Sequence, residues 1–234
     1  MREGPYYDMT GDGPVLLLMP GGAGHPMGLG PLTERLTRRF TVVTYDPLGL
    51  AHGRLGLPVP DQRPRDWSGG ARRVLEAVLP PGERARVFGT SSGGIAALDL
   101  LARHPGRLAH VVAHEPPCAL VLPDGEERRR ELIAALDGDD RARPEGPMGV
   151  FLAHVLRPFT AYVPAAPDEP ERLTLAVGAD SRGELPRRSA ELLAARFGSR
   201  SLEFPGGHLG TLEHPAEFAD RLTEVLLGGL ASGA

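Results

Sequence analysis

Short runs of apolar and β-branched residues alternate along this chain with longer segments whose apolar residues recur at helical spacing. The short runs predict strands over 15–19, 41–45, 85–88, 108–113, 173–177 and 201–204. The longer segments predict helices over 32–39, 69–79, 93–103, 187–196 and 215–227. Such alternation is typical of βαβ crossover units, so the sequence predicts an α/β fold with a mostly parallel central sheet flanked by helices.

One stretch interrupts the alternation. Residues 116–170 are rich in charge, proline and glycine, yet they contain an apolar segment over 148–159. We interpret this stretch as a short lid inserted into a core formed by residues 1–115 and 171–234. Its position after a strand end favours a lid, because ligands of open α/β sheets bind outside the carboxyl ends of the strands. An additional helix packed on the sheet is the alternative.

Composition narrows the classes of function. The chain has 234 residues, 41% of them hydrophobic, and a formal net charge of −4, which is typical of one globular domain. The acidic balance argues against a nucleic-acid partner and favours a small-molecule substrate. The sequence contains neither lysine nor asparagine. This excludes mechanisms that need a lysine amine, such as Schiff bases and Ser-Lys dyads, and it suggests GC-rich coding in a bacterial source.

Nothing in the sequence indicates an oxidising or membrane environment. The single cysteine, Cys118, cannot form an internal disulfide or a thiolate zinc site. The first apolar run, 15–19, is too short for a signal core or a membrane span. We therefore expect a cytoplasmic protein without a membrane partner, and the sequence leaves its oligomeric state open.

The candidate chemistry begins at a Gly-x-Ser-x-Gly motif formed by Gly89, Ser91 and Gly93. The motif lies between a predicted strand and a predicted helix, as a nucleophile elbow requires. Small residues on both sides of the serine let neighbouring backbone approach the sharp turn, and the helix amides can stabilise negative charge on a substrate oxygen. Centring the motif on Ser92 would put Thr90 where the first glycine belongs. Ser91 is therefore the predicted nucleophile, and Ser92 contributes its backbone N–H.

With this motif the chain resembles the α/β-hydrolase family. Further segments in the right order extend the resemblance over most of the chain: a glycine-rich run over 19–24, Tyr-Asp-Pro-Leu-Gly over 45–49, and a glycine-flanked histidine after the last strand. The resemblance implies that the amide of Gly22 joins that of Ser92 in an oxyanion hole. Because Pro20 replaces the frequent histidine, the register is open by one residue, and Ala23 is the alternative.

The resemblance also implies the other members of a catalytic triad. His208, on the loop after the last strand, is the predicted general base. For the acid two carboxylates compete, each at a strand end. Asp180 follows the strand over 173–177 and is preferred, although many family members place the acid one residue further on, at the position of Ser181. Glu115, which closes the strand before the lid, is the alternative.

The predicted lid gives a limited view of the substrate. Phe151 and Phe159 suggest contact with an apolar group, whereas His154 and Arg157 could bind a polar or anionic portion. The alternative reading has the apolar side chains in the core and the polar ones in solvent.

The leading hypothesis is a serine hydrolase that cleaves an ester, thioester or lactone through an acyl-enzyme on Ser91. It needs no cofactor and no catalytic metal; the sequence contains neither His-Glu-x-x-His nor a dinucleotide fingerprint. Two alternatives stay open. The same scaffold could catalyse carbon–carbon bond hydrolysis, cofactor-free haloperoxidation or a secondary-metabolite tailoring step, or it could be a catalytically silent ligand receptor.

Overall fold

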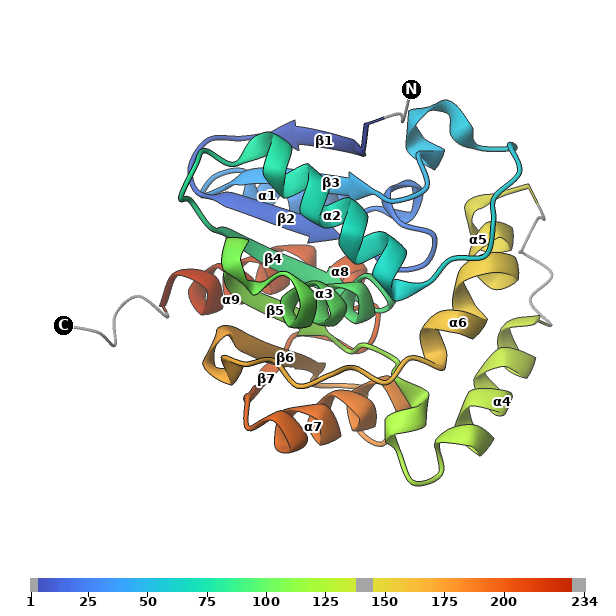
Figure 1. The fold of residues 1–234 in the computed structure, drawn as a ribbon. Helices are drawn as coiled ribbons and strands as arrows, with labels where there is room; N and C mark the ends of the chain where they lie inside the picture. The colour runs from blue at the N-terminus through green and yellow to red at the C-terminus, as the bar shows by residue number, and fades with distance from the viewer. Residues whose placement is uncertain (1–3, 138–144, 229–234) are drawn as a thin grey trace.

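A seven-stranded sheet organises the protein in the computed structural model, which describes residues 4–137 and 145–228 (Figure 1). The strands lie in the order β1-β3-β2-β4-β5-β6-β7. Only β1 is antiparallel to its neighbour, and all other pairs are parallel. The strand bounds are β1 Tyr6–Thr10, β2 Val15–Met19, β3 Thr41–Asp46, β4 Ala85–Thr90, β5 Leu108–His114, β6 Leu173–Gly178 and β7 Arg200–Phe204.

Helices cover both faces of this sheet. Their bounds are α1 Gly30–Leu36, α2 Pro64–Val78, α3 Ser92–Arg103, α4 Gly125–Asp137, α5 Pro147–Val150, α6 Leu156–Thr160, α7 Leu185–Phe197, α8 Gly210–Glu213 and α9 Pro215–Gly228. Short helical turns are η1 His25–Met27, η2 Leu50–Arg54, η3 Pro105–Arg107, η4 Ala119–Val121, η5 Phe151–Val155 and η6 Pro170–Arg172. Helices α2, α3 and α7 lie in front of the sheet in Figure 1, with α1 and α9 behind it.

The core consists of two apolar layers, because successive side chains of a strand point to opposite faces. Leu17, Val87 and Val111 face the layer that contains α2, α3 and α7. Leu16 and Phe88 face the layer that contains α1 and α9. The central strands are therefore apolar at nearly every position, as expected for parallel strands buried on both faces. The predicted fold class is confirmed.

All six predicted strands and all five predicted helices are present, but β1 was not predicted. The polar, glycine-containing start of the chain conceals it, since Asp8, Met9 and Thr10 are exposed at the sheet edge. An edge strand buries too little to impose an apolar pattern. The largest differences in helix bounds are that α1 ends at Leu36, before the predicted 39, and that α2 begins at Pro64, before the predicted 69. Proline is favoured at the first helical position.

The predicted lid segment, 116–170, holds helices α4, α5 and α6. Figure 1 shows them on the side of the molecule toward which the arrows of β2 and β3 point, so they lie near the carboxyl ends of the parallel strands. Part of the segment, 138–144, is outside the described residues. Its role as a lid stays a prediction.

A buried carboxylate anchors the end of this segment to the core. Asp99 of α3 is fully buried and accepts hydrogen bonds from Ser68 of α2, from Arg103 Nε at 2.9 Å and from the hydroxyl of Tyr162 at 2.5 Å. Tyr162 lies two residues after the end of α6. The contact therefore ties the predicted lid, residues 116–170, which we call the cap segment, to α2 and α3.

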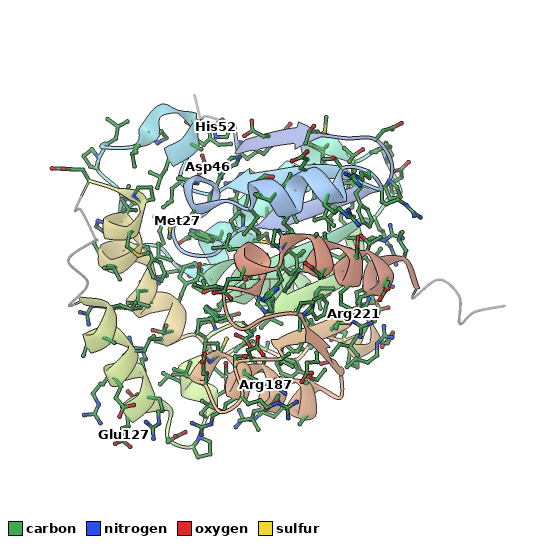
Figure 2. The ribbon with its side chains drawn as sticks, turned by 180° about the vertical axis from the view of Figure 1, so that it is seen from behind. Met27, Asp46, His52, Glu127, Arg187 and Arg221 are labelled. Atoms are coloured by element: carbon green, nitrogen blue, oxygen red, sulfur yellow. The ribbon has the colours of Figure 1, made fainter. Side chains whose placement is uncertain are left out.

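The loop after β3 is closed by a second buried carboxylate. Asp46 accepts from the amides of Leu50 and Ala51, at 3.2 and 2.9 Å, and its Oδ2 lies 2.8 Å from His52 Nδ1. Figure 2, seen from behind, shows Asp46 and His52 together at this end of the molecule. The family-like segment 45–49 thus shapes a loop.

In the described part of the chain, no helix has the length and apolar character that crossing a membrane requires.

The glycines beside Ser91 are required by close backbone packing. A Cβ on Gly93 would overlap the carbonyl oxygen of Met19 on β2, and a Cβ on Gly89 would overlap that of Gly93. Helix α3 can therefore begin directly against the neighbouring strand only if both positions lack a side chain.

We expect Gly93→Ala to lower the free energy of unfolding by about 1–3 kcal/mol, the usual cost of overpacking. Gly69→Ala is the matched control, because Gly69 lies within α2 and a Cβ there meets only Arg73, at 3.9 Å. The control should be neutral or slightly stabilising, since alanine favours helix more than glycine does. Urea unfolding of both variants measures the difference; equal stability would contradict the steric account.

Candidate active site

Ser91 lies at the sharp turn between β4 and α3. Its backbone is left-handed, with φ 53° and ψ −122°. Its amide donates to the carbonyl of His114 at 3.0 Å, and its own carbonyl accepts from Ile95 at 3.1 Å. The first bond ties the turn to the end of β5, and the second joins it to the first turn of α3. The side chain is partly exposed, so a substrate could reach its hydroxyl.

His208 lies on the loop after β7, in the run Gly206-Gly207-His208. A Cβ on Gly178, at the end of β6, would come within 2.6 Å of the carbonyl oxygen of Gly206. Glycine at the end of β6 thus lets the histidine loop lie directly against the neighbouring strand. The imidazole of His208 projects to the elbow, where its Nε2 lies 3.2 Å from Ser91 Oγ.

Glu115 completes the arrangement from the end of β5. Its Oε2 lies 3.0 Å from His208 Nδ1. Because a carboxylate can only accept, the proton of the neutral imidazole lies on Nδ1, and Nε2 is free to accept from the hydroxyl of Ser91. His208 therefore bridges a hydroxyl and a carboxylate in the geometry of a Ser-His-acid triad.

The environment of Glu115 keeps its carboxyl ionised. The side chain is fully buried, and burial by itself raises its pKa. Hydrogen bonds from His208, from the hydroxyl of Ser181 and from the amide of Gly178, the last at 2.8 Å, outweigh burial and lower the pKa to about 2. A negative charge therefore faces His208 throughout the neutral pH range.

Backbone strain occurs at two of the three triad residues, Ser91 and Glu115. Among residues 4–137 and 145–228, Ser91 and Glu115, with φ 53° and 44°, are the non-glycine residues with positive φ. Such conformations cost free energy and persist where the surroundings enforce them, often at functional sites. Both strained residues lie within hydrogen-bond distance of one imidazole, that of His208.

The preference for Asp180 as the acid is corrected by this geometry. Asp180 is exposed, and its amide donates to the carbonyl of Gly206 at 3.0 Å. The chain turns after Gly178 so that the side chain of Ser181 points to the buried carboxylate, while that of Asp180 faces solvent. The alternative acid, Glu115, is the carboxylate that the structure brings to His208.

Ser181 is the site residue that sequence reasoning missed. It occupies the position where many family members place the acid, and its hydroxyl donates to Glu115 instead. This departure from the family pattern was a usable signal. A serine at the usual place of the acid indicates that the carboxylate comes from a neighbouring strand.

The glycine-rich loop after β2 lies against the elbow. A Cβ on Gly21 would approach that of Ser91 to 3.0 Å, and the hydroxyl of Ser92 donates to the carbonyl of Gly22 at 2.9 Å. The amide of Ala23 faces Met27 Sδ at 3.3 Å. The amide of Ala23, the alternative oxyanion donor, is thus directed to the sulfur. The amides of Gly22 and Ser92 are the candidate donors to a substrate oxyanion.

The four residues predicted to contact substrate from the cap segment lie in different surroundings. Phe159 is 1% exposed and packs edge-on against Trp67, with ring centroids 4.8 Å apart. It is therefore a core residue, and its predicted contact with substrate is wrong. His154 Nδ1 lies 3.0 Å from Asp61, and Arg157 is exposed. His154 is thus paired with a carboxylate outside the triad.

Phe151 differs from these. It is partly buried and packs against a small apolar cluster whose buried members are Ala23, Leu50 and Val150, bordered by Met27, Leu48 and Val59. The cluster joins the cap segment to the loops after β2 and β3. Phe151 therefore lies beside the loop that carries Gly22, one of the two candidate oxyanion donors.

The described residues contain no group of three or more His, Cys, Asp or Glu side chains arranged to hold a metal ion. The assembled groups are a hydroxyl, an imidazole, a buried carboxylate and two backbone amides. Together they can activate the hydroxyl as a nucleophile and stabilise a developing oxyanion.

Known proteins resemble this chain in sequence and in fold. No family model matches the chain. The chain is 28% identical over 251 residues to "Uncharacterized hydrolase YraK" of Bacillus subtilis, covering 94% of this chain and 92% of that protein.

Two solved structures have the same fold. A thermophilic esterase from Thermogutta terrifontis matches with a TM-score of 0.69 and 19% identity over 96% of this chain and 93% of its own. The enol-lactonase of Burkholderia xenovorans matches with a TM-score of 0.63 and 19% identity over 97% and 96%. These similarities to structures of hydrolases, together with the mostly parallel sheet, show that the chain has the α/β-hydrolase fold.

Proposed function

We propose that this α/β hydrolase is a serine hydrolase that cleaves an ester, thioester or lactone of a small molecule. The observation that carries the proposal is the bridging position of His208, with Nε2 3.2 Å from Ser91 Oγ and Nδ1 3.0 Å from Glu115 Oε2. A receptor would have no need for a strained serine held against an oriented imidazole. The similarity to proteins described as hydrolase, esterase and enol-lactonase supports the same reaction class.

In the proposed mechanism, His208 takes the proton of Ser91 while the serine oxygen attacks the substrate carbonyl. The amides of Gly22 and Ser92 donate to the resulting oxyanion. His208 then protonates the leaving group. A water molecule, deprotonated by the same imidazole, attacks the acyl carbon, the bond to Ser91 breaks, and the imidazolium returns the proton to the serine oxygen. Glu115 stays ionised and stabilises the imidazolium that forms in each step.

The cap segment supports an apolar group on the substrate. Val150 and Phe151 extend the apolar cluster over the loop that carries Gly22 and Ala23. We propose that residues 116–170 form a lid whose apolar side faces the substrate, and that Phe151 contacts it. His154 and Arg157, which lie at the surface, are less suited to this role.

Substitution of the candidate nucleophile tests the proposed reaction. Purified protein should hydrolyse short p-nitrophenyl esters, and Ser91→Ala should reduce kcat by about 10³-fold or more, because the covalent step is lost. Ser201→Ala is the matched control, since it removes an exposed serine hydroxyl on β7, outside the candidate site. Turnover of p-nitrophenyl esters by Ser91→Ala at the wild-type rate would contradict the proposal.

Substitution of each carboxylate tests whether Glu115 or Asp180 is the acid of the triad. Glu115→Gln should lower kcat by about 10²- to 10⁴-fold, because an amide at this position no longer stabilises the imidazolium of His208. Asp180→Asn should leave kcat unchanged, since the carboxylate of Asp180 faces solvent. Steady-state kinetics on the same esters measures both variants. Loss of activity in Asp180→Asn with retention in Glu115→Gln would overturn the assignment of the acid.

A further inference from the structure

A second histidine lies directly behind the candidate triad. His114 is the last residue of β5, immediately before Glu115, and is fully buried. Its carbonyl accepts from the amide of Ser91, and its ring is stacked against that of His208, with centroids 6.3 Å apart and planes at 20°. One residue thus contacts both the nucleophile and the base and precedes the acid in the chain.

One ring nitrogen of His114 has a partner and the other has none. Nδ1 lies 3.1 Å from the hydroxyl oxygen of Thr90, the residue before Ser91. Nε2 is buried without a hydrogen-bond partner in the described part of the chain. A buried N–H without an acceptor is rarer and costlier than a buried acceptor without a donor. The ring is therefore best satisfied with its proton on Nδ1, donated to Thr90.

Burial also keeps this ring uncharged. Burial lowers the pKa of His114 to about 3, with the nearby Glu115 raising it and His208 lowering it further. At neutral pH a neutral ring therefore faces the imidazole that becomes positive during the reaction. A cation at this position would repel that charge, whereas a neutral ring does not.

The unsatisfied Nε2 needs an explanation, because an apolar side chain of similar shape would avoid its desolvation cost. The contacts of its ring with neighbouring aromatic rings suggest a role for the side chain. The ring of His114 is stacked against that of His208, and the ring of Phe218 meets it edge-on, with centroids 5.0 Å apart. Phe218 supports it from α9, and the bond to Thr90 fixes its rotation about the side chain. A ring held in this way limits the positions that the imidazole of His208 can take.

We propose that His114 is a positioning residue, whose ring, fixed by its hydrogen bond to Thr90, holds the imidazole of His208 between Ser91 and Glu115. The proposal rests on the serine hydrolase function proposed above. It assigns no proton transfer to His114, because its ring does not contact the reacting atoms.

The same strand offers a matched control. His110 of β5 also forms one hydrogen bond to a threonine, with Nε2 2.9 Å from the hydroxyl of Thr174 on β6. This His–Thr pair has the same chemistry and joins neighbouring strands of the same sheet. His110 lies near the start of β5, away from the end of the strand that carries His114 and Glu115.

The test compares His114→Phe and Thr90→Val with the control variants His110→Phe and Thr174→Val, using p-nitrophenyl ester kinetics and urea unfolding. His114→Phe and Thr90→Val should lower kcat by about 10- to 100-fold with little change in KM, the effect of a misplaced catalytic group. Thr90→Ser, which keeps the hydroxyl, should restore kcat. The control variants can lose stability but should keep the wild-type kcat.

A double variant adds a second readout. If His114 and Thr90 act through one hydrogen bond, the variant carrying both His114→Phe and Thr90→Val should have a kcat no lower than that of the weaker single variant. Additive losses would show that the two residues act separately and would overturn the proposal. If His114→Phe does not fold, the contrast between Thr90→Val and Thr90→Ser decides alone.

The outcomes also distinguish the two proposals. If wild-type protein neither turns over any ester nor reacts with a serine-directed phosphonate, the serine hydrolase function fails, and the positioning role fails with it. If the wild type is active but His114→Phe and Thr90→Val keep its kcat, only the positioning role is wrong. An equal loss of kcat in the His110 and Thr174 variants would also contradict it, because a general effect of sheet stability would then explain the loss.

Discussion

The buried carboxylate of Glu115 is the constraint on which the site depends. An ionised group without solvent must have its charge compensated by hydrogen bonds, and here these come from the end of β6, through Gly178 and Ser181, and from the loop after β7, through His208. Satisfying one charge therefore fixes the relative positions of three neighbouring strand ends. The left-handed backbone of Glu115 places the carboxylate at their meeting point.

Close backbone approach is the second requirement, and the chain meets it by leaving out side chains. Gly93 lets α3 begin against β2, Gly21 lets the glycine-rich loop lie on Ser91, and Gly178 admits the histidine loop. Each contact brings a different part of the candidate site within hydrogen-bond distance of the elbow. The cost in chain entropy is compensated by the buried sheet, whose apolar layers pack on both faces.

Local patterns were sufficient to predict most of the fold and the turn at Ser91, because buried parallel strands, helices and a glycine-flanked turn each have their own sequence signal. The candidate base, His208, came from the resemblance to the α/β-hydrolase family. The choice of acid required tertiary information. Both Asp180 and Glu115 follow strands that end at the same edge, and only the path of the chain after Gly178 directs one of them to solvent. Strand β1 and the core position of Phe159 escaped for the same reason, since neither is encoded in a local period.

The most direct test of the central claim, that the hydroxyl of Ser91 is the activated nucleophile, is peptide mass spectrometry after reaction with a fluorophosphonate. Ser91 and Ser92 lie in one peptide, so fragmentation locates the adduct between two adjacent hydroxyls of which only one faces His208. The account predicts a single adduct on Ser91. An adduct on Ser92, or an unmodified peptide from correctly folded protein, would contradict it.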